Sequence, residues 1–336
     1  MRFPSSVRLV GTGTIHGTVT AAADAHRPVR LHRLTWAGDD VRLFELRALD
    51  GEALPLWEAG AHIELELGNG LVRPYSLLPS HRADTYRAAI KRAADSTGGT
   101  RWLFGRGQVG TLLTVSAPLN TFPLGEGPAV LVGGGIGVTP LVSMAAALDA
   151  RGERSWHLHY AVARRDQAAL LDELAPYGDR VRLHVDAEVG AVLDVQRIVA
   201  ESPPDARLYA CGPNPLLAAL EQAAVAAGRD RSTIMVERFD PVTEAATGGG
   251  YTVVLARSGT RLAVPPGTTI LGALRKAGLS TQTICERGAC GVCEVAVLEG
   301  IPDHRDAVLS PEEQQDGTAM MICCSGSLTP ELVLDL

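Results

Sequence analysis

After residue 25, the first third of the chain consists of short segments with strand-like patterns. Residues 61–67, Ala-His-Ile-Glu-Leu-Glu-Leu, alternate polar and apolar side chains, as a half-buried strand does. Short apolar runs also occur at 41–46 and 112–115, and turn residues rather than long helical patterns separate them. Repeated short strands of this kind predict a small antiparallel β-barrel over residues 26–125.

From about residue 126 the pattern changes to an alternation of buried strands and helices. This order predicts a parallel sheet with helices on both faces, over residues 126–240. In such folds, ligands bind at the carboxyl ends of the strands. The expected strands are 129–132, 156–162, 181–185 and 207–210, and the expected helices are 141–148, 167–177, 194–200 and 215–227.

Residues 241–250 contain few large apolar side chains and end in three glycines. This composition predicts a flexible connector that would let the following domain swing between an electron donor and an acceptor. The strand pattern then restarts at 251–256 and 260–264, and a helix is expected near 270–277. A third domain is therefore predicted over residues 251–336.

The overall composition narrows the class of protein. The formal charge of the 336-residue chain is −7, which disfavours a nucleic-acid surface. No apolar run is long enough to cross a membrane, and no secretory h-region follows the first residues. Residues 1–25 are poor in large apolar side chains, so we expect a loosely docked extension, to which we assign no function. We expect a cytoplasmic protein without membrane or nucleic-acid contacts, and we take it to be a monomer.

Five of the six cysteines lie in the last quarter of the chain. Cys285, Cys290 and Cys293 have the spacing C-x4-C-x2-C, which is typical of a plant-type [2Fe–2S] cluster completed by a distant fourth cysteine. We predict Cys323 as that ligand, and its neighbour Cys324 as a packed or solvent-facing thiol. A zinc site is the alternative, although zinc sites more often show paired C-x2-C units.

Two glycines lie inside the cysteine loop. Gly288 and Gly291 lack a Cβ, so they can adopt positive φ and let backbone amides point at the cluster sulfurs. Acidic residues outnumber basic ones over residues 251–336, and such a surface could steer a basic partner. A solvated acidic face explains the same composition.

Residues 73–76, Arg-Pro-Tyr-Ser, combine three groups suited to a flavin. An arginine offers a fork for phosphate, an aromatic side chain can lie on a flat ring, and a serine hydroxyl can reach a ring nitrogen. Gly-Gly-Thr at 98–100 opens a predicted helix, where free backbone N–H groups form an anion-binding site. Together these segments predict a flavin site, whereas each alone fits a basic-edged hairpin or a glycine loop equally well. The predicted residues are Arg73, Pro74, Tyr75, Ser76, Ile90, Lys91, Gly98, Gly99 and Thr100.

The glycine-rich turn at 133–140 follows the first strand of the predicted parallel sheet. It departs from G-x-G-x-x-G because residue 138 is valine, but its N–H groups can still cradle a pyrophosphate. A turn needed only for packing is the alternative. Cys211 and Gly212 end a later strand, where a nicotinamide could approach the backbone, although a cysteine there is more often simply buried, and no base for it is evident in the sequence.

The residues Ala-Arg-Arg-Asp at 163–166 follow the second strand of that sheet. Asp166 could hold the ribose hydroxyls of NADH, and Arg164 could hold the 2′-phosphate of NADPH, so the choice stays open. A solvated loop is an equally good interpretation. The predicted nucleotide-site residues are Gly134, Gly135, Thr139, Arg164, Asp166, Cys211, Gly212 and Pro213.

The order of these motifs resembles that of phthalate dioxygenase reductase and the reductase of vanillate O-demethylase. Arg-Pro-Tyr-Ser-Leu, Gly-Gly-Thr, Gly-Gly-Gly-Ile-Gly-Val-Thr-Pro, Cys-Gly-Pro and the cysteine loop follow one another over residues 26–336. Smaller marks of the same family stand at 59–63, 118–124, 303–306 and 332–336.

The resemblance implies a ferredoxin-reductase type of flavin and nucleotide domains, followed by a ferredoxin of α+β, β-grasp type. It implies FMN rather than FAD, on the smaller marks, and NADH as the donor, with NADPH possible. By position, Arg73, Tyr75 and Ser76 would meet the flavin, and Gly98, Gly99 and Thr100 its phosphate. Thr100 stands where such loops often have serine.

The implied electron path runs from NADH through FMN and the [2Fe–2S] cluster to an external acceptor, and it requires no acid–base dyad. Ser76, near flavin N5, and Cys211, near the nicotinamide, are the residues expected closest to the chemistry. The acceptor implied is a terminal oxygenase, either a Rieske oxygenase or an O-demethylase. The alternatives are a cytochrome P450 partner and a redox sensor that turns over poorly.

Overall fold

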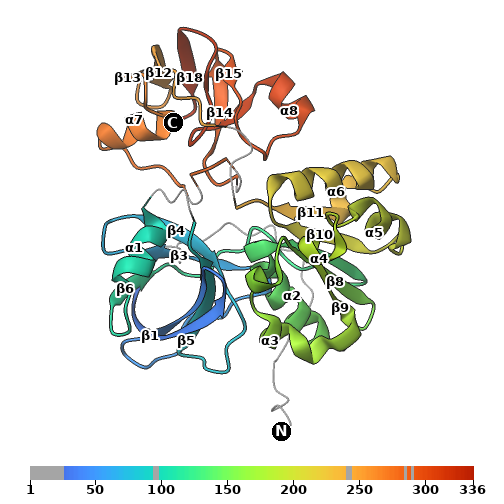
Figure 1. The fold of residues 1–336 in the computed structure, drawn as a ribbon. Helices are drawn as coiled ribbons and strands as arrows, with labels where there is room; N and C mark the ends of the chain where they lie inside the picture. Colours follow the sequence, from blue (N-terminus) through green and yellow to red (C-terminus); the bar gives the residue numbers. More distant parts are fainter. Residues whose placement is uncertain (1–25, 94–97, 240–243, 284–285, 289–290) are drawn as a thin grey trace.

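The computed structural model describes residues 26–93, 98–239, 244–283, 286–288 and 291–336. The expected extension over residues 1–25 and the predicted ligands Cys285 and Cys290 lie outside these ranges. The described residues form three units, each built around one main sheet (Figure 1). The predicted fold class is confirmed: an antiparallel unit, a parallel α/β unit and a C-terminal unit with a mixed sheet.

Six antiparallel strands form the first unit, in the order β4-β3-β6-β1-β2-β5. The outermost strands of that order, β4 and β5, also contact each other, which curls the sheet towards a barrel. Inward-facing residues build an apolar core in which Phe44, Leu46, Ile63 and Leu65 are fully buried. The elements are β1 (Arg27–Gly38), β2 (Val41–Ala48), β3 (His62–Glu66), β4 (Val72–Ser76), β5 (Thr85–Lys91), α1 (Gly99–Arg106) and β6 (Leu112–Val115).

Five parallel strands form the second unit, in the order β11-β10-β7-β8-β9. Strand β7 is buried along its whole length because its residues alternate between two cores. Leu131 packs with α2 on one face, while Val130 and Val132 pack with α5 and α6 on the other. The elements are β7 (Ala129–Gly134), α2 (Val138–Ala150), β8 (Trp156–Val162), α3 (Leu171–Leu174), β9 (Val181–Val185), α4 (Asp186–Val189), α5 (Val195–Glu201), β10 (Arg207–Cys211), α6 (Asn214–Ala226) and β11 (Ile234–Glu237).

The predicted helix over residues 167–177 is wrong. Helix α3 is limited to Leu171–Leu174, with 3-10 turns on both sides. Leu170 has a left-handed backbone with φ of 61°, and the N–H of Ala169 donates to the Tyr160 hydroxyl at 2.9 Å. Tertiary contacts override the helical pattern here, because the N–H of Leu170 also donates to the Ala37 carbonyl of the first unit at 3.3 Å.

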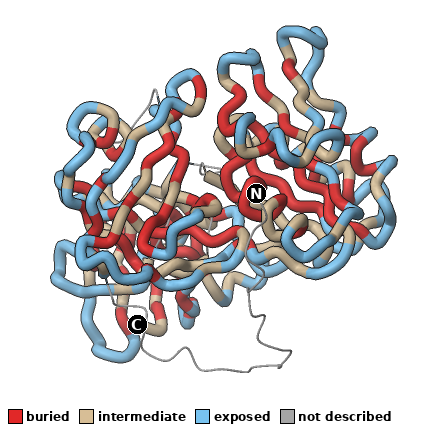
Figure 2. The backbone as a smooth tube through the Cα atoms, turned by 90° about the horizontal axis from the view of Figure 1, so that it is seen from below, coloured by how far each residue is buried: buried red, intermediate tan, exposed pale blue. Residues whose placement is uncertain are grey.

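The first and second units share one continuous apolar core. Leu43 and Leu78 of the first unit pack in the same cluster as Tyr160 of the second. The buried N–H of Gly60 donates to Ser143 Oγ at 3.0 Å across the same seam. Figure 2 shows the buried backbone in the interiors and the exposed backbone in the outer loops. The two units therefore form one packed body.

The third unit has the strand order β13-β12-β18-β14-β16 and a small pair, β15 with β17. Strands β12 and β18 are parallel, and the other pairs are antiparallel. Thr269 caps α7 by accepting from the N–H of Gly272 at 3.1 Å. Among the helices that the structure describes, none has the length and apolar character to span a membrane. The elements are β12 (Tyr251–Leu255), β13 (Thr260–Val264), α7 (Ile270–Lys276), β14 (Glu294–Glu299), β15 (Pro302–Asp303), α8 (Pro311–Asp316), β16 (Ala319–Met321), β17 (Gly326–Ser327) and β18 (Glu331–Leu334).

The end of the predicted connector is attached to the third unit. The N–H of Ala246 donates to the Cys324 carbonyl at 2.7 Å, and the N–H of Gly250 donates to the Val264 carbonyl at 2.8 Å. Gly249 has φ of 61°, and a Cβ there would lie 2.3 Å from the carbonyl carbon of Pro265. A pivot between the units would therefore have to precede Ala246.

Candidate flavin, nucleotide and cluster sites

The two predicted flavin motifs meet in the structure. Strand β4 carries Arg73, and α1 begins at Gly99 after Gly98, which is left-handed with φ of 111°. A Cβ on Gly99 would lie 2.9 Å from Arg73 Cγ and 3.3 Å from its Nε. The arginine stem therefore lies across the N-terminus of the helix, where backbone N–H groups favour an anion. Thr100 Oγ1 accepts from the N–H of Ala93 at 3.2 Å, which links the first turn of α1 to the residues that follow β5.

The polar groups on β4 suit a bound flavin. The Tyr75 hydroxyl is buried without a hydrogen-bond partner among the described residues. Burial raises the pKa of Tyr75 far above its usual value, against the opposing charges of Arg73 and Arg287, so the hydroxyl stays a donor. A buried hydroxyl left unsatisfied costs about 1–3 kcal/mol, and an acceptor on a ligand would remove that cost. Ser76 is buried next to it.

His62 is a neighbour of this site that the sequence motifs did not single out. It lies opposite Ser76 in the β3–β4 register. Burial lowers the pKa of His62 to about 4, so the ring is neutral at pH 7. Of the other predicted residues, Pro74 is half-buried, Ile90 is buried in the barrel core, and Lys91 is exposed at the end of β5.

The two predicted nucleotide motifs also meet. Strands β7 and β10 are neighbours, with Gly133 opposite Cys211. A Cβ on Gly137 would lie 2.3 Å from the Cys211 carbonyl oxygen, and a Cβ on Gly134 would lie 2.6 Å from Pro213 Cδ. Close packing of these loops therefore requires glycine, whatever the loops bind. Gly135 has φ of 54°, and the Thr139 hydroxyl donates to the Ile136 carbonyl at 3.0 Å inside the same turn.

The described part of the cysteine loop packs against the fourth-ligand region. Cys293, Cys323 and Cys324 are all buried, so the packed alternative for Cys324 is confirmed over the solvent-facing one. A Cβ on Gly288 would lie 2.4 Å from Cys324 Sγ. Gly288 and Gly291 have φ of 70° and 78°, which confirms the predicted positive φ. Cys285 and Cys290 lie outside the described residues.

Comparison with known proteins supplies the class of the whole chain. The 2Fe-2S iron-sulfur cluster binding domain matches residues 253–326. Over 320 residues the chain is 47% identical to the phenoxybenzoate dioxygenase subunit beta of Ectopseudomonas oleovorans, covering 94% of this chain and 99% of that protein. The solved structure of phthalate dioxygenase reductase aligns with a TM-score of 0.76 and 34% identity, over 93% of this chain and 98% of that one.

The chain belongs to the phthalate dioxygenase reductase family. It is an oxidoreductase, the reductase component of an oxygenase system, and it passes electrons from NAD(P)H through a flavin to a [2Fe–2S] cluster. The predicted iron–sulfur domain is confirmed in place of the zinc alternative. An intact type IV self-sufficient cytochrome P450 monooxygenase also aligns, with a TM-score of 0.76 and 38% identity, over 93% of this chain and 41% of that one.

In this reductase, Arg164 and Asp166 lie at the seam between the first two units. Arg164 Nη2 is 3.1 Å from Asp166 Oδ2 and 3.3 Å from Asp39 Oδ2, on the turn between β1 and β2. The N–H of Asp39 donates to the Asp166 carbonyl at 2.8 Å. The charge of Arg164 is therefore matched by two carboxylates.

The reductase has a buried carboxyl group that the sequence motifs missed. Glu237 ends β11 and lies opposite Cys211 on β10. Burial raises the pKa of Glu237 to about 8, although a hydrogen bond with Cys211 opposes the shift, so this carboxyl is protonated at pH 7. The sequence signal was weak: one acidic residue ends an otherwise apolar strand.

A second buried carboxyl group, that of Asp306, holds a backbone segment that contacts the cysteine loop. The side chain of Asp306 has no exposed surface, and its Oδ2 accepts from the N–H groups of Val308 at 3.1 Å and Leu309 at 2.9 Å. The next residue, Ala307, donates its N–H to the Gly288 carbonyl at 2.8 Å. Asp306 therefore shapes the segment on which the loop rests.

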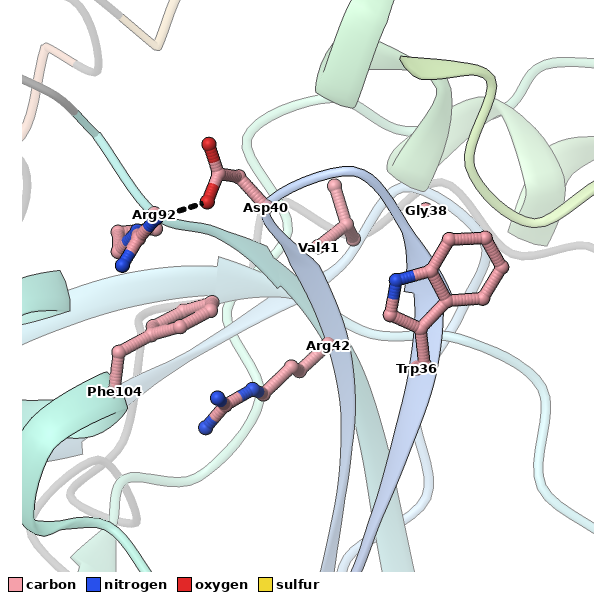
Figure 3. A pocket seen from close by; sticks show the side chains of 7 residues that line it. All are labelled: Trp36, Gly38, Asp40, Val41, Arg42, Arg92 and Phe104. Carbon is pink, nitrogen blue, oxygen red and sulfur yellow. Dashed lines mark ion pairs between the residues drawn. The ribbon is translucent and has the colours of Figure 1, made fainter. Parts of the chain in front are cut away.

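A small surface pocket lies at the edge of the first unit, lined by residues of β1, β2 and α1 and by Arg92 (Figure 3). Its charged groups are engaged with one another or with an aromatic ring. Arg92 pairs with Asp40 at 2.6 Å, and Arg42 lies 4.7 Å from the centre of the Phe104 ring. Trp36 is 75% exposed on its rim. No buried polar group points to a ligand there, so we assign the pocket no role.

Proposed function

We propose that the flavin of this reductase is FMN. The observation that carries the proposal is the contact between Arg73 and Gly99, which brings a guanidinium to the N–H groups that begin α1. A terminal phosphate monoester is matched by both groups. FMN ends in such a phosphate, whereas FAD continues into a second nucleotide.

Chromatography of the flavin released by heat tests this proposal, because recovery of FAD would contradict it. Arg73→Ala should weaken FMN binding by about tenfold to a hundredfold, since a charge-assisted hydrogen bond is lost. Riboflavin, which has no phosphate, serves as the control ligand. An equal loss of riboflavin affinity would assign Arg73 to the ring rather than the phosphate.

When bound, the flavin supplies the ability to accept a hydride and to release electrons one at a time. The side chains of the chain bind and orient it. In our proposal the Tyr75 hydroxyl donates a hydrogen bond to the ligand, Ser76 lies near N5, and Lys91 adds positive charge. The proposed flavin-binding residues are Arg73, Pro74, Tyr75, Ser76, Ile90, Lys91, Gly98, Gly99 and Thr100.

We further propose that NADH is the donor and lies along the carboxyl ends of β7, β8 and β10. Gly134, Gly135 and Gly212 would let the dinucleotide come close to the protein backbone, and Cys211 would lie beside the nicotinamide. The carboxylates of Asp39 and Asp166 around Arg164 support NADH, because they reduce the attraction of Arg164 for a 2′-phosphate. The proposed nucleotide-binding residues are Gly134, Gly135, Thr139, Arg164, Asp166, Cys211, Gly212 and Pro213.

Steady-state kinetics with both nucleotides test the donor. We expect kcat/KM for NADH to exceed that for NADPH by at least about tenfold, a difference of 1.4 kcal/mol. Equal values would contradict the assignment.

For the cluster we propose Cys285, Cys290, Cys293 and Cys323 as ligands. Cys323→Ser and Cys324→Ser form a matched pair of adjacent buried cysteines. The first should lose the rhombic EPR signal of the native cluster and part of its iron, and the second should retain both. The opposite pattern would make Cys324 the ligand.

The proposed acceptor is a Rieske-type oxygenase or an O-demethylase. A cytochrome P450 is the second candidate, supported by the alignment with a P450 monooxygenase. Anaerobic mixing of the NADH-reduced protein with each acceptor distinguishes them through the rate of acceptor reduction. Reduction of the cytochrome P450 but not of the oxygenase would overturn the first choice. Reduction of cytochrome c at a high rate would exclude a redox sensor that turns over slowly.

We propose domain boundaries at 26–125 for flavin binding, 126–240 for nucleotide binding, 241–250 for the connector and 251–336 for the ferredoxin. We also propose a cytoplasmic monomer. Limited proteolysis with mass analysis tests the boundaries, and light scattering tests the monomer. Cleavage mainly within a proposed domain, or the mass of a dimer, would contradict these assignments.

A further inference from the structure

One side chain of the cysteine loop reaches out of the third unit. Arg287 Nη1 donates to the carbonyl oxygen of Phe239. Phe239 follows β11 and packs against the apolar core shared by the first two units. The contact therefore joins the loop that carries predicted cluster ligands to the end of the nucleotide-binding unit.

The same arginine lies close to the flavin motif. Its positive charge acts on Tyr75 together with that of Arg73, although burial is the larger influence on the pKa of that tyrosine. Tyr75 belongs to β4 of the first unit. Arg287 is thus placed where all three units meet, and Figure 1 shows the third unit on one side of the other two.

The residues around Arg287 are tied to the third unit itself. Arg275 on α7 binds Glu286 Oε1 at 2.5 Å and Thr283 Oγ1 at 3.2 Å. On the other side of Arg287, the Gly288 carbonyl accepts from the N–H of Ala307 at 2.8 Å. The described residues on both sides of Arg287 are therefore anchored to the third unit, so the bond to Phe239 holds this part of the loop against the second unit.

The bond across the seam is charge-assisted, because the guanidinium of Arg287 donates to the carbonyl oxygen of Phe239.

We propose that Arg287 is a positioning residue that docks the cysteine loop against Phe239 and the flavin site, and so sets the rate of electron transfer from flavin to cluster. The proposal rests on the proposed flavin site at Tyr75. Electron transfer between bound cofactors depends on the distance and orientation that the protein imposes. The first two units pack together through their own shared core, so the step from NADH to flavin should not depend on this bond.

Anaerobic stopped-flow mixing with NADH, combined with freeze-quench EPR, separates flavin reduction from cluster reduction. Arg287→Ala should slow cluster reduction by at least about tenfold, while flavin reduction keeps its rate. Arg287→Lys should recover most of the rate because it keeps a long cationic donor. Arg257→Ala is the matched control, since it removes an arginine that pairs with Asp335 within the third unit and leaves the bond from Arg287 to Phe239 intact.

Cluster EPR, iron content and midpoint potential of each variant identify a merely structural effect. Unchanged values with slow transfer support the docking role. Loss of iron or a shifted potential in both Arg287→Ala and Arg287→Lys would overturn it in favour of loop integrity. Wild-type transfer in Arg287→Ala would also overturn it. A wild-type protein without NADH-reducible flavin would instead refute the proposed function, so the two failures are distinguishable.

Discussion

Arg73 and Gly99 lie in direct contact: a Cβ on Gly99 would come 2.9 Å from Arg73 Cγ. The arginine belongs to β4 and the glycine to the first turn of α1, so a strand and a helix N-terminus share one anion-binding corner. Each segment is ordinary by itself. Their contact turns two weak motifs into one site.

Gly99→Ala should therefore displace Arg73 and weaken FMN binding by about tenfold, equivalent to about 1.4 kcal/mol. Gly105→Ala is the control in the same helix, because a Cβ at Gly105 meets nothing within 4 Å. The control should bind FMN normally and gain up to about 1 kcal/mol of stability from its better helix propensity. Fluorescence titration of each apoprotein with FMN measures the two affinities. Equal affinities in the two variants would contradict a role of the Arg73–Gly99 contact in FMN binding.

Gly137→Ala should destabilise the nucleotide-binding unit. Its new Cβ would lie 2.3 Å from the Cys211 carbonyl oxygen, and backbone atoms cannot move aside easily. Overpacking of this kind costs about 1–3 kcal/mol. Scanning calorimetry should show a lower Tm, and KM for NADH should rise. Gly248→Ala, where the added Cβ meets nothing within 4 Å, should change neither.

Glu237 should make folding stability depend on pH. Burial raises its pKa to about 8 in the folded state from the ordinary value of 4.5. Between these values the folded state holds a proton that the unfolded state releases, so stability decreases as pH rises through this window. Glu237→Gln is neutral at every pH, so its free energy of unfolding, measured in urea, should not show this decrease. Above about pH 8 the variant should be more stable than the wild type by a few kcal/mol. A variant with the wild-type slope would show that another group is responsible.

Asp306→Asn should alter the cluster as well as the fold. The amide keeps the shape of the carboxylate but removes a buried negative charge from the segment that supports the cysteine loop. Loss of the charge should raise the midpoint potential of the cluster. Weaker hydrogen bonds should cost about 1–3 kcal/mol of stability. EPR-monitored redox titration checks the first effect; Asp303→Asn, at a more exposed carboxylate, is the control and should shift the potential less.

Several features were predictable from the sequence because their causes are local. The alternation at residues 61–67 reports a strand with one buried face, and β3 occupies that segment. The continuous apolar run at 129–132 reports a strand buried on both faces, as β7 is. Positive φ at Gly288 and Gly291 followed from the need for a tight loop around the cysteines.

Other features depend on residues that meet only after folding. The helix predicted at 167–177 is interrupted by the left-handed backbone of Leu170 and by the hydrogen bond from the N–H of Ala169 to the Tyr160 hydroxyl. Local helix propensity predicts neither feature. Glu237 gained its raised pKa from neighbouring strands that exclude water. The end of the glycine-rich connector, expected to be loose, is hydrogen-bonded to the third unit through Ala246 and Gly250.

By itself, then, the sequence determined the antiparallel and parallel sheets of the first two units, the cysteine spacing of the cluster domain and the order of the motifs. These follow from side-chain periodicity and ligand chemistry, which act over a few residues. The tertiary structure alone decided that Arg73 meets Gly99, that Glu237 lies beside Cys211, and that Arg287 reaches Phe239. Such contacts depend on strand order and on the packing of one unit against another, because desolvation and charge act through space rather than along the chain.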